Sequence, residues 1–452
     1  MITRRNFIKG SAAFGSLMFL SSCSTLKVRR ANSVVQVAIV GVGGQGMAAV
    51  KRLSPHSRVV AFCDVDDSRA AEAYKLYPNV PRFRDYRVML DKMDKDIDAV
   101  AVCTPDHMHY PVCAWAISKG KHVFCEKPLT RTIWEASDLA RMTADANVIT
   151  QMGNQGHTNE GWRLIKEWAD AGIIGEVEDV YIWTDRPIWP QGELKVPAGQ
   201  PVPKTLDYNL WRGVAPYQPY NGSFIPFAWR GLRNYGTGAA GDMACHFMDV
   251  PYSAFELGFP VSVTANSTPF NSYSWPAEAS STMLFNSRYG KGGKITLHWS
   301  DGGRRPPKIK RVDPDFLADK RNKNCTFIVG TKCTVMTNEY GLYTTIYPRM
   351  QMREMVKSNA LPPKKIPRSS FAGNPHGEWA AAIIEGVNPL ANFAYAAPFT
   401  QVVLLGMVAV LMPNTPLEFD PVSLKFKNCP EADKFVSSLY PYREEFLPHK
   451  VD

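Results

Sequence analysis

The stretch VVQVAIV at residues 34–40, followed at once by GVGGQG at residues 41–46, decides the fold of this chain. Its first part is apolar and β-branched, which predicts a buried strand, and its second part matches the pattern G-x-G-x-x-G at the start of a helix. In such a turn Gly41 permits the tight bend, Gly43 lets the backbone approach a pyrophosphate, and Gly46 lets the helix pack closely on the strand. The helix N-terminus then offers N–H groups and a positive dipole end to phosphates.

A carboxylate stands where the next predicted strand ends. Residues 58–63 have strand composition, and Asp64 follows them, 18 positions after Gly46. A carboxylate at this place can accept hydrogen bonds from both hydroxyls of an adenosine ribose. It would repel a 2′-phosphate, so we expect NAD as the cofactor and NADP as the less favoured one. The alternative is a flavodoxin-like sheet whose glycines serve only packing.

Strands and helices continue to alternate as far as residue 150. The predicted elements after Asp64 are a helix at 67–76, a strand at 99–103, a helix at 110–118, a strand at 122–125, a helix at 132–146 and a strand at 148–152. Alternation at this spacing predicts a parallel, doubly wound sheet. We therefore predict an α/β protein with a Rossmann domain, binding NAD, at residues 34–150.

The pattern changes beyond residue 150, and 452 residues exceed what one ordinary core holds. An amphipathic helix is predicted at 160–171, and strands are predicted at 176–184, 261–268, 280–285, 294–299 and 325–329. Residues 185–235 are rich in Pro, Gly, Trp and Tyr and are too long for a simple connection, which favours a substrate-facing loop. We predict that 151–452 form a substrate-binding and oligomerisation domain, α+β in class, with a large, open, mostly antiparallel sheet.

The N-terminus has the pattern of an export signal. Arg4 and Arg5 precede a short apolar stretch, as in twin-arginine signals, which carry folded cargo. The stretch ends Leu-Ser-Ser before Cys23, which resembles a lipobox, so we expect a signal at 1–22, lipidation of Cys23 and a tether at 23–33. The protein would then be periplasmic or anchored to the outer membrane, with its lipid on the membrane surface. The alternative is a cleaved signal in which Cys23 is coincidental.

Charge and cysteine content argue against several other classes of protein. The net charge is +10, yet the basic residues are scattered apart from the run at 304–311, which we interpret as a solvated loop because no nucleic-acid fold signature accompanies it. The cysteines show no metal-ligand spacing, so we expect no metal site and mainly buried free thiols. After the N-terminus we expect no stretch of about 18 apolar residues that could span a bilayer.

Two further clusters carry groups suited to proton transfer. Lys127 lies in Glu126-Lys127-Pro128 at the end of a predicted strand, where open sheets bind ligands. Asp242 and His246 lie four apart on one face of a predicted helix, with Asp249 one turn further. A histidine oriented by a carboxylate suits proton transfer near neutral pH. Alone, the first cluster could be a surface turn and the second a helix-surface ion pair.

Together these motifs resemble the Gfo/Idh/MocA family, which includes glucose–fructose oxidoreductase and inositol dehydrogenase, and the resemblance extends from Val34 to about Asn414. It implies that Lys127 polarises the substrate, that His246 transfers the proton and that Asp242 positions both. It also implies that Thr104, Pro105 and His109 border the nicotinamide half and that Arg230 reaches the cofactor. The full predicted cofactor-binding set is Gly41, Gly43, Gly44, Gln45, Gly46, Asp64, Thr104, Pro105, His109, Glu126, Lys127 and Arg230. The resemblance further implies a homo-oligomer, a dimer or a tetramer.

The chain departs from the family pattern where the substrate would bind. Residues 151–157 replace a more usual arginine-containing segment, and the aromatic loop between residues 183 and 229 is unusually long. The candidate substrate contacts are Asn154, His157, Asp249 and His376, with a cap or core histidine as the alternative for His376. Trp and Tyr side chains of the loop offer faces on which pyranose rings could stack.

The sequence therefore predicts a carbohydrate substrate and hydride transfer between NAD and a secondary hydroxyl of a sugar or glycoside, with C3 as the expected position. Free dinucleotide is scarce outside the cytoplasm, so we expect tightly bound cofactor. One alternative is an NAD-dependent glycoside hydrolase of the oxidation–elimination type, against which the retained Lys127 argues. Another is a non-catalytic sugar-binding lipoprotein, against which Lys127, Asp242 and His246 argue together.

Overall fold

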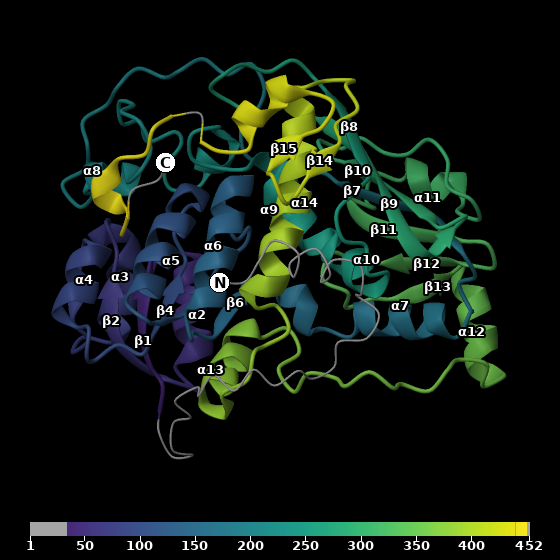
Figure 1. The fold of residues 1–452 in the computed structure, drawn as a ribbon, viewed down its shortest axis with the longest axis horizontal. Helices are drawn as coiled ribbons and strands as arrows, with labels where there is room; N and C mark the ends of the chain where they lie inside the picture. Colours follow the sequence, from purple (N-terminus) through teal and green to yellow (C-terminus); the bar gives the residue numbers. More distant parts are fainter. Residues whose placement is uncertain (1–33, 439, 450–452) are drawn as a thin grey trace.

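In the computed structural model, which describes residues 34–438 and 440–449, two sheets lie side by side with a long helix between them (Figure 1). The signal at 1–22 and the tether at 23–33, with Cys23, lie outside the described residues and stay predictions.

The first sheet consists of six parallel strands in the order β3-β2-β1-β4-β5-β6. The strands are β1 (Gln36–Val40), β2 (Arg58–Cys63), β3 (Arg82–Phe83), β4 (Ala99–Val102), β5 (His122–Cys125) and β6 (Thr150–Met152). The helices α2 (Gln45–Leu53), α3 (Asp67–Leu76), α4 (Tyr86–Lys92), α5 (His109–Ser118) and α6 (Ile133–Asp145) connect them. The predicted doubly wound α/β sheet is confirmed. Its strand order reverses between β1 and β4, so a crevice opens there at the C-terminal ends of the strands.

The two central strands are apolar because helices cover both faces of the sheet. Every residue of β4 is buried, as are four of the five residues of β1. Parallel strands of this kind have continuous apolar sequences rather than alternating ones. Because their apolar sequences are continuous, these strands could be predicted from the sequence. The two-residue β3 and the helix α4 carry a weaker signal and were not predicted.

The second sheet has seven strands in the order β13-β12-β11-β7-β10-β9-β8. They are β7 (Val177–Thr184), β8 (Ser262–Ser267), β9 (Ala279–Lys291), β10 (Lys294–Ser300), β11 (Asn324–Gly330), β12 (Thr334–Thr337) and β13 (Thr345–Tyr347). β7 runs parallel to β10, while most neighbouring pairs are antiparallel, as predicted. β9 is longer than expected because it turns directly into β10 through Gly292 and Gly293, whose positive φ angles suit a tight hairpin.

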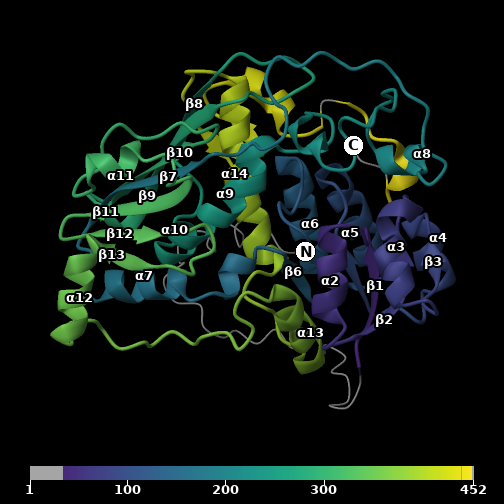
Figure 2. The ribbon, with the colours of Figure 1, turned by 180° about the vertical axis from the view of Figure 1, so that it is seen from behind.

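Helix α14 (Phe393–Leu411) lies between the two sheets in both views (Figures 1 and 2). It has 19 residues and no charged side chain, so the expectation that no stretch would reach the length of a membrane span was wrong. Among the described residues it is the one helix long and apolar enough, and 78% of its most apolar 18-residue window is buried within the fold. It packs on α6, on β8 and on α9 (Gly238–Phe247).

The chain returns to the first sheet after building the second. Helix α13 (Pro375–Glu385) packs on α2, and its Trp379 and Ile383 join the apolar cluster beneath β1 and β4. The division near residue 150 therefore separates the two sheets, whereas the helices cross it. The other elements are α7 (Gly161–Asp170), α8 (Tyr208–Arg212), α10 (Asp249–Ala254), α11 (Pro314–Ala318), α12 (Arg349–Lys357), β14 (Phe419–Asp420) and β15 (Lys425–Phe426).

The basic run at 304–311 forms ion pairs within the protein, and most of the cysteines are buried. Arg304 pairs with Glu278, Arg305 with Asp185, and Lys310 with Glu178. The run is thus a loop in which these three cations form internal ion pairs. All eight cysteines in the described part of the chain are free thiols, and all but Cys103 are buried, as expected.

Candidate active site

A cavity of about 500 Å³ opens at the C-terminal edge of the first sheet. Its walls come from the glycine turn after β1, the ends of β2, β4 and β5, helix α9, and the loops at 206–211 and 225–230. The glycine turn, Asp64, Lys127, Asp242 and His246 all contribute to this one cavity. The two halves of the chain therefore share a site.

The glycine turn requires glycine for steric reasons. Gly41 has φ +80°, and a Cβ there would lie 2.7 Å from the carbonyl oxygen of Cys103. A Cβ on Gly46 would lie 1.7 Å from the carbonyl oxygen of Gly41. Helix α2 begins after Gly44 without a side-chain cap, and the amides of Gly44 and Gln45 have no hydrogen-bond partner within the described residues. This bare helix N-terminus, facing the cavity, fits the phosphates of a dinucleotide.

Asp64 lies beside the glycine turn, as its spacing predicted. One carboxylate oxygen accepts a hydrogen bond from the amide of Val42 at 2.8 Å, and the other accepts one from the amide of Asp66 at 2.9 Å. Burial raises the pKa of this carboxyl. Each oxygen keeps acceptor capacity toward the cavity, so the residue fits a ribose diol. Arg69 also lines this end, so the preference for NAD over NADP stays a prediction.

Two segments far apart in the sequence cover this end of the cavity, and we call them the clasp: residues 205–213 and residues 443–446. The first is joined to the Rossmann sheet by the amide of Asp67 donating to Thr205 and the amide of Asp207 donating to Val65, at 3.1 and 2.8 Å. Leu206 and Trp211 of this segment line the cavity. The clasp thus begins with backbone pairing across the dinucleotide groove.

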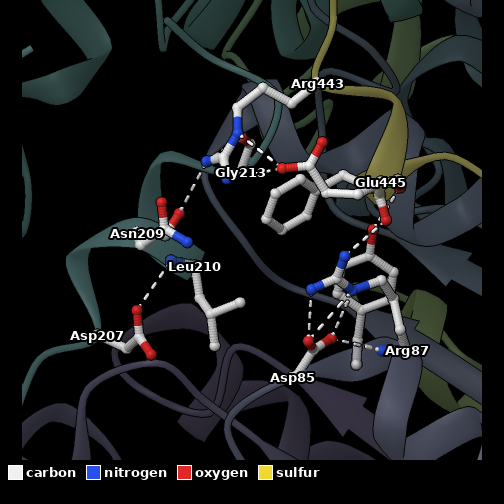
Figure 3. A network of polar contacts seen from close by, with 10 residues as sticks. Asp85, Arg87, Asp207, Asn209, Leu210, Gly213, Arg443 and Glu445 are labelled. Carbon is white, nitrogen blue, oxygen red and sulfur yellow. Dashed lines mark hydrogen bonds and ion pairs between the residues drawn. The ribbon is translucent and has the colours of Figure 1, made fainter. Parts of the chain in front are cut away.

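The C-terminal segment completes the clasp (Figure 3). The Arg443 guanidinium donates to the carbonyl of Gly213 at 3.1 Å and pairs with Glu445 at 2.8 Å. Arg87 of α4 donates to the carbonyl of Glu445 at 2.6 Å. Phe446, which lines the cavity, lies between Arg87 and Arg443, whose guanidinium carbons are 4.3 and 4.7 Å from its ring centroid. A cofactor seated on the glycine turn would be enclosed by these groups.

Lys127 and Asp242 form a nearly buried ion pair at the other end of the cavity. The Lys127 ammonium donates to the Asp242 carboxylate at 2.8 Å and to its backbone carbonyl at 3.0 Å. Burial lowers the pKa of Lys127, but the charge of Asp242 outweighs burial and raises it above its usual value. Burial raises the pKa of Asp242, but Lys127 and Arg230 together hold it at about 2. Both groups are therefore ionised at neutral pH.

His246 lies one turn after Asp242 on α9, but the two do not form the predicted pair. Neither ring nitrogen of His246 has a hydrogen-bond partner among the described residues, and Nδ1 is buried. The carboxylate of Asp242 bonds to Lys127 instead, because an ammonium is a stronger partner than a neutral imidazole. Burial, followed by the charge of Lys127, lowers the pKa of His246 to about 3. The imidazole is thus neutral and its ring edge faces Tyr340 at 5.1 Å.

The cavity is also lined by the three residues that were predicted to border the nicotinamide half: Thr104, Pro105 and His109. The Thr104 hydroxyl is buried without a partner among the described residues, so it is available to a ligand. His109 Nε2 lies 2.9 Å from the Thr104 carbonyl and Nδ1 lies 2.7 Å from the Pro128 carbonyl. This ring links the turn after β4 to the turn after β5, which carries Lys127. Its contacts position the backbone.

Glu126 and Arg230 also reach the cavity. Burial raises the pKa of Glu126 despite the opposing charge of Lys127. The Arg230 guanidinium lies 3.6 Å from the Asp242 carboxylate and over the rings of Trp229 and Phe227. Both residues therefore lie next to the Lys127–Asp242 pair.

Three of the predicted substrate contacts are buried together outside this cavity. Asn154, His157 and Tyr395 all bond to the carboxylate of Asp249, at 2.8, 2.9 and 2.6 Å. Asp249 is not on the helix of His246, because α9 ends at Phe247 and α10 begins at Asp249. Pro251 has no N–H to donate to the Phe247 carbonyl, which accounts for the break. Asn154, His157 and Asp249 do not line this cavity, and their contact with a substrate stays a prediction.

His376 is a core histidine, which was the alternative prediction for it. Its ring stacks on Phe124 with centroids 4.0 Å apart, and it does not line the cavity. Its Nε2 lies 3.8 Å from the Glu126 carboxylate. Burial lowers its pKa to about 3. Its one described link to the site is therefore this approach to Glu126, which itself lines the cavity.

Three residues that were not predicted from the sequence line the catalytic end of the cavity: Gln155, Arg186 and Tyr340. Arg186 lies in the segment predicted to face the substrate, so its location carried a signal although its residue type was not considered. Tyr340 comes from the turn after β12 and had no local signal. The aromatic side chains of the loop at 185–235 pack mainly on each other, in a cluster that includes Tyr208, Trp211, Phe224, Trp229 and Tyr235. They are chiefly the core of the loop.

The chain matches two family models, which describe the N-terminal and the C-terminal domain of the same family of proteins. One, "Oxidoreductase family, NAD-binding Rossmann fold", matches residues 35–154. The other, "Oxidoreductase family, C-terminal alpha/beta domain", matches residues 177–302. Together the two matches span more than half of the chain.

Individual proteins resemble the chain more distantly. Inositol 2-dehydrogenase of Mycolicibacterium smegmatis is 32% identical over 32% of this chain and 42% of its own length. Glycosyl hydrolase family 109 protein 2 of Shewanella sp. is 26% identical over 49% of this chain and 52% of its own length. The chain spans about half the length of the curated relatives it matches. A levoglucosan dehydrogenase solved with NADH and L-sorbose superposes with TM-score 0.57 at 17% identity, over 85% of this chain and 98% of that one, which shows a shared fold.

Proposed function

Because the chain belongs to the Gfo/Idh/MocA family of NAD-binding oxidoreductases, we propose that it oxidises a secondary hydroxyl of a sugar or glycoside with NAD. The observation that carries this proposal is that Lys127 and His246 line the same cavity as the glycine turn and Asp64. A general base, a cationic hydrogen-bond donor and a dinucleotide cradle are the groups that alcohol oxidation requires.

The protein's own groups would act on the hydroxyl. Neutral His246, whose ring nitrogens have no hydrogen-bond partner in the described part of the chain, accepts the proton of the hydroxyl. The Lys127 ammonium donates a hydrogen bond to the hydroxyl oxygen and stabilises the negative charge that develops there. Asp242 holds that ammonium in place at 2.8 Å. The bound dinucleotide supplies the hydride acceptor.

The NAD and sugar assignments have separate support. Asp64 favours NAD, since a carboxylate there repels a 2′-phosphate, and Asp64→Ala should relax the preference against NADP. The names of relatives, inositol 2-dehydrogenase and levoglucosan dehydrogenase, support a polyhydroxylated substrate. Oxidation at C3 of a glucoside is the position we propose.

We further propose that the cofactor is a retained prosthetic group, which the clasp over the adenosine end supports. The test is to purify the protein without added nucleotide, denature it by heat and assay the supernatant for NAD(H). Retention predicts near-stoichiometric dinucleotide. Folded, active protein that releases none would refute retention.

The experiment for the function is a nicotinamide-fluorescence screen against mono- and disaccharides, with Lys127→Ala as the inactive control. Cofactor reduction by a sugar, lost in the variant, is the expected result. The second candidate is a glycoside hydrolase of the oxidation–elimination type, favoured by the glycosyl hydrolase relative. Release of phenol from aryl glycosides by the pure protein would select it. Sugar binding that survives in Lys127→Ala, without turnover in the parent protein, would indicate a non-catalytic binding protein.

We propose that the protein is exported by the twin-arginine route, lipidated at Cys23 and homo-oligomeric. The paired arginines and the lipobox-like sequence support export, and the family resemblance supports oligomerisation. Membrane fractionation of the parent protein and of Cys23→Ser tests the anchor, and light scattering of the purified protein tests the oligomer. A Cys23→Ser variant that stays with the membrane would contradict lipid anchoring.

A further inference from the structure

Arg186 is a partly buried arginine at the catalytic end of the cavity, and its guanidinium has no polar partner among the residues that the structure describes. It follows β7 and lines the cavity together with His246 and Tyr340. Its guanidinium carbon lies 5.8 Å from the centroid of the Trp189 ring. Within residues 34–438 and 440–449, no carboxylate lies within ion-pair distance of it. Its charge is therefore left unneutralised by the fold.

The neighbouring charges do not compensate Arg186. Asp242 is already shared by Lys127 at 2.8 Å and Arg230 at 3.6 Å. Glu126 is buried beside Lys127, and its pKa is raised by that burial. Asp106, a further carboxyl in the cavity wall, accepts hydrogen bonds from the amide and the hydroxyl of Thr237, so none of these three carboxyls pairs with Arg186. A guanidinium in a cavity wall that has no carboxylate partner in the described part of the chain is available to pair with a ligand.

The phosphates of the cofactor do not explain this cation. The groups suited to phosphates are the amides of the glycine turn and helix α2, in the first domain. Arg186 comes from the second domain, and its charge acts on two groups of the catalytic end: His246, whose pKa is lowered chiefly by burial, and Tyr340, whose pKa is raised chiefly by burial. It therefore lies with the groups that would contact the substrate.

We propose that Arg186 binds an oxyanion, a carboxylate or a sulfate ester, carried by the sugar whose hydroxyl meets Lys127 and His246. The proposal rests on the proposed function, since it places the acidic group on that same substrate. A guanidinium donates two parallel N–H hydrogen bonds, which the two oxygens of an oxyanion can accept together. A single hydroxyl oxygen cannot accept both in this geometry. The substrate class would be acidic sugars, and a neutral sugar would leave Arg186 unpaired.

The experiment compares methyl β-glucoside, methyl β-glucuronide and glucose 6-sulfate with the full chain. Turnover is followed by nicotinamide fluorescence, and binding is measured separately by calorimetry. The variants are Arg186→Gln and Arg186→Lys, with Arg321→Gln, an exposed arginine on α11's following turn, as the matched control. We expect at least one acidic sugar to bind about 10- to 100-fold more tightly than the neutral one. Arg186→Gln should remove that advantage through KM, whereas Arg321→Gln should keep it.

The outcomes separate this proposal from the proposed function. Preference for only the glucuronide, or only the sulfate, identifies the oxyanion and supports the proposal. Neutral sugars that bind as well as acidic ones, or an Arg186→Gln variant that weakens all three equally, overturns it while leaving oxidation intact. Acidic sugars that bind through Arg186 without reducing the cofactor support this site and count against the redox function. An advantage that Arg186→Lys retains in part, while Arg186→Gln loses it, supports the proposal, because the lysine keeps the positive charge but not the two parallel N–H donors.

Discussion

The two ends of the cavity differ in how completely the fold satisfies them. At the adenosine end, both oxygens of Asp64 accept backbone hydrogen bonds, and the clasp residues Arg443 and Glu445 are paired. At the catalytic end, the Thr104 hydroxyl and His246 Nδ1 are buried without partners in the described structure. Apart from the amides that the glycine turn leaves for phosphates, folding satisfies the first end, whereas at the second end it pairs Lys127 with Asp242 and leaves these two groups to a ligand.

This difference has a physical reason. A buried polar group without a partner costs about 1–3 kcal/mol, so a fold retains one only where something else offsets the cost. Paired groups at the adenosine end favour a cofactor that stays. Unpaired groups at the catalytic end favour a ligand that arrives, reacts and leaves. Each prediction below tests one side of this contrast.

The largest effect is expected for His246→Gln. Loss of the base should lower kcat by about 10²–10⁴-fold, because proton transfer by a positioned side chain contributes that much. The melting temperature should hardly change, since the imidazole makes no hydrogen bond within the described residues. Steady-state kinetics and thermal melts check both parts. His298→Gln on β10, outside the cavity, is the control, and an active His246→Gln variant would remove this residue from the mechanism.

Lys127→Met should destabilise the protein, in contrast to His246→Gln. It leaves the Asp242 carboxylate buried without its closest partner, which costs about 3–5 kcal/mol in the free energy of unfolding. Urea denaturation measures this, and adding Asp242→Asn should recover much of the loss. Lys291→Met breaks an exposed pair with Glu178, whose charges are screened by solvent, and should cost far less than Lys127→Met. Equal losses in the two lysine variants would contradict the contrast.

Arg443→Ala should speed cofactor loss without abolishing chemistry. It removes the contacts of the C-terminal segment to Gly213 and one side of the stack on Phe446. A loss of about 1.4 kcal/mol would raise the rate of NAD release about tenfold. Dilution of the loaded protein with excess dinucleotide-scavenging enzyme measures the release rate. Arg321→Ala, at an exposed arginine, is the control. If Arg443→Ala releases NAD no faster than this control, the clasp does not retain the cofactor.

The smallest effect is expected for pH. The folded pKa of His246 is about 3, so the imidazole stays neutral, and able to accept a proton, well below neutrality. We therefore expect kcat/KM for oxidation to show no fall attributable to this base between pH 8 and pH 5. A pH–rate profile with an acid limb near pH 6.5, lost with His246→Gln, would mean that the imidazole titrates near its usual pKa.

Some of the site could be predicted because its signals are local. The glycine turn and Asp64 lie at the ends of adjacent strands, and strand ends meet at one edge of a parallel sheet. Lys127 follows the same logic at the end of β5. The pairing of Asp242 with Lys127 instead of His246 could not be seen, because residues from two domains compete for one carboxylate. The prediction that Asp249 shares a helix with His246 was wrong for a local reason, since Pro251 interrupts that helix and α9 ends at Phe247.

Other features had no local signal at all. Phe446 encloses the adenosine end from the last residues of the chain, and Tyr340 reaches the catalytic end from a turn of the second sheet. The apolar α14 was overlooked because it is hydrophobic on every side, a composition that burial between two domains explains.

The sequence by itself determined the Rossmann sheet, the place of the dinucleotide turn and the presence of an acid, a lysine and a histidine suited to redox chemistry. These follow from backbone geometry and side-chain periodicity over a few residues. Only the tertiary structure decided which charges are paired, which polar groups are left for a ligand and which distant segments cover the cavity. Those outcomes depend on competition among groups that meet only when the chain is folded.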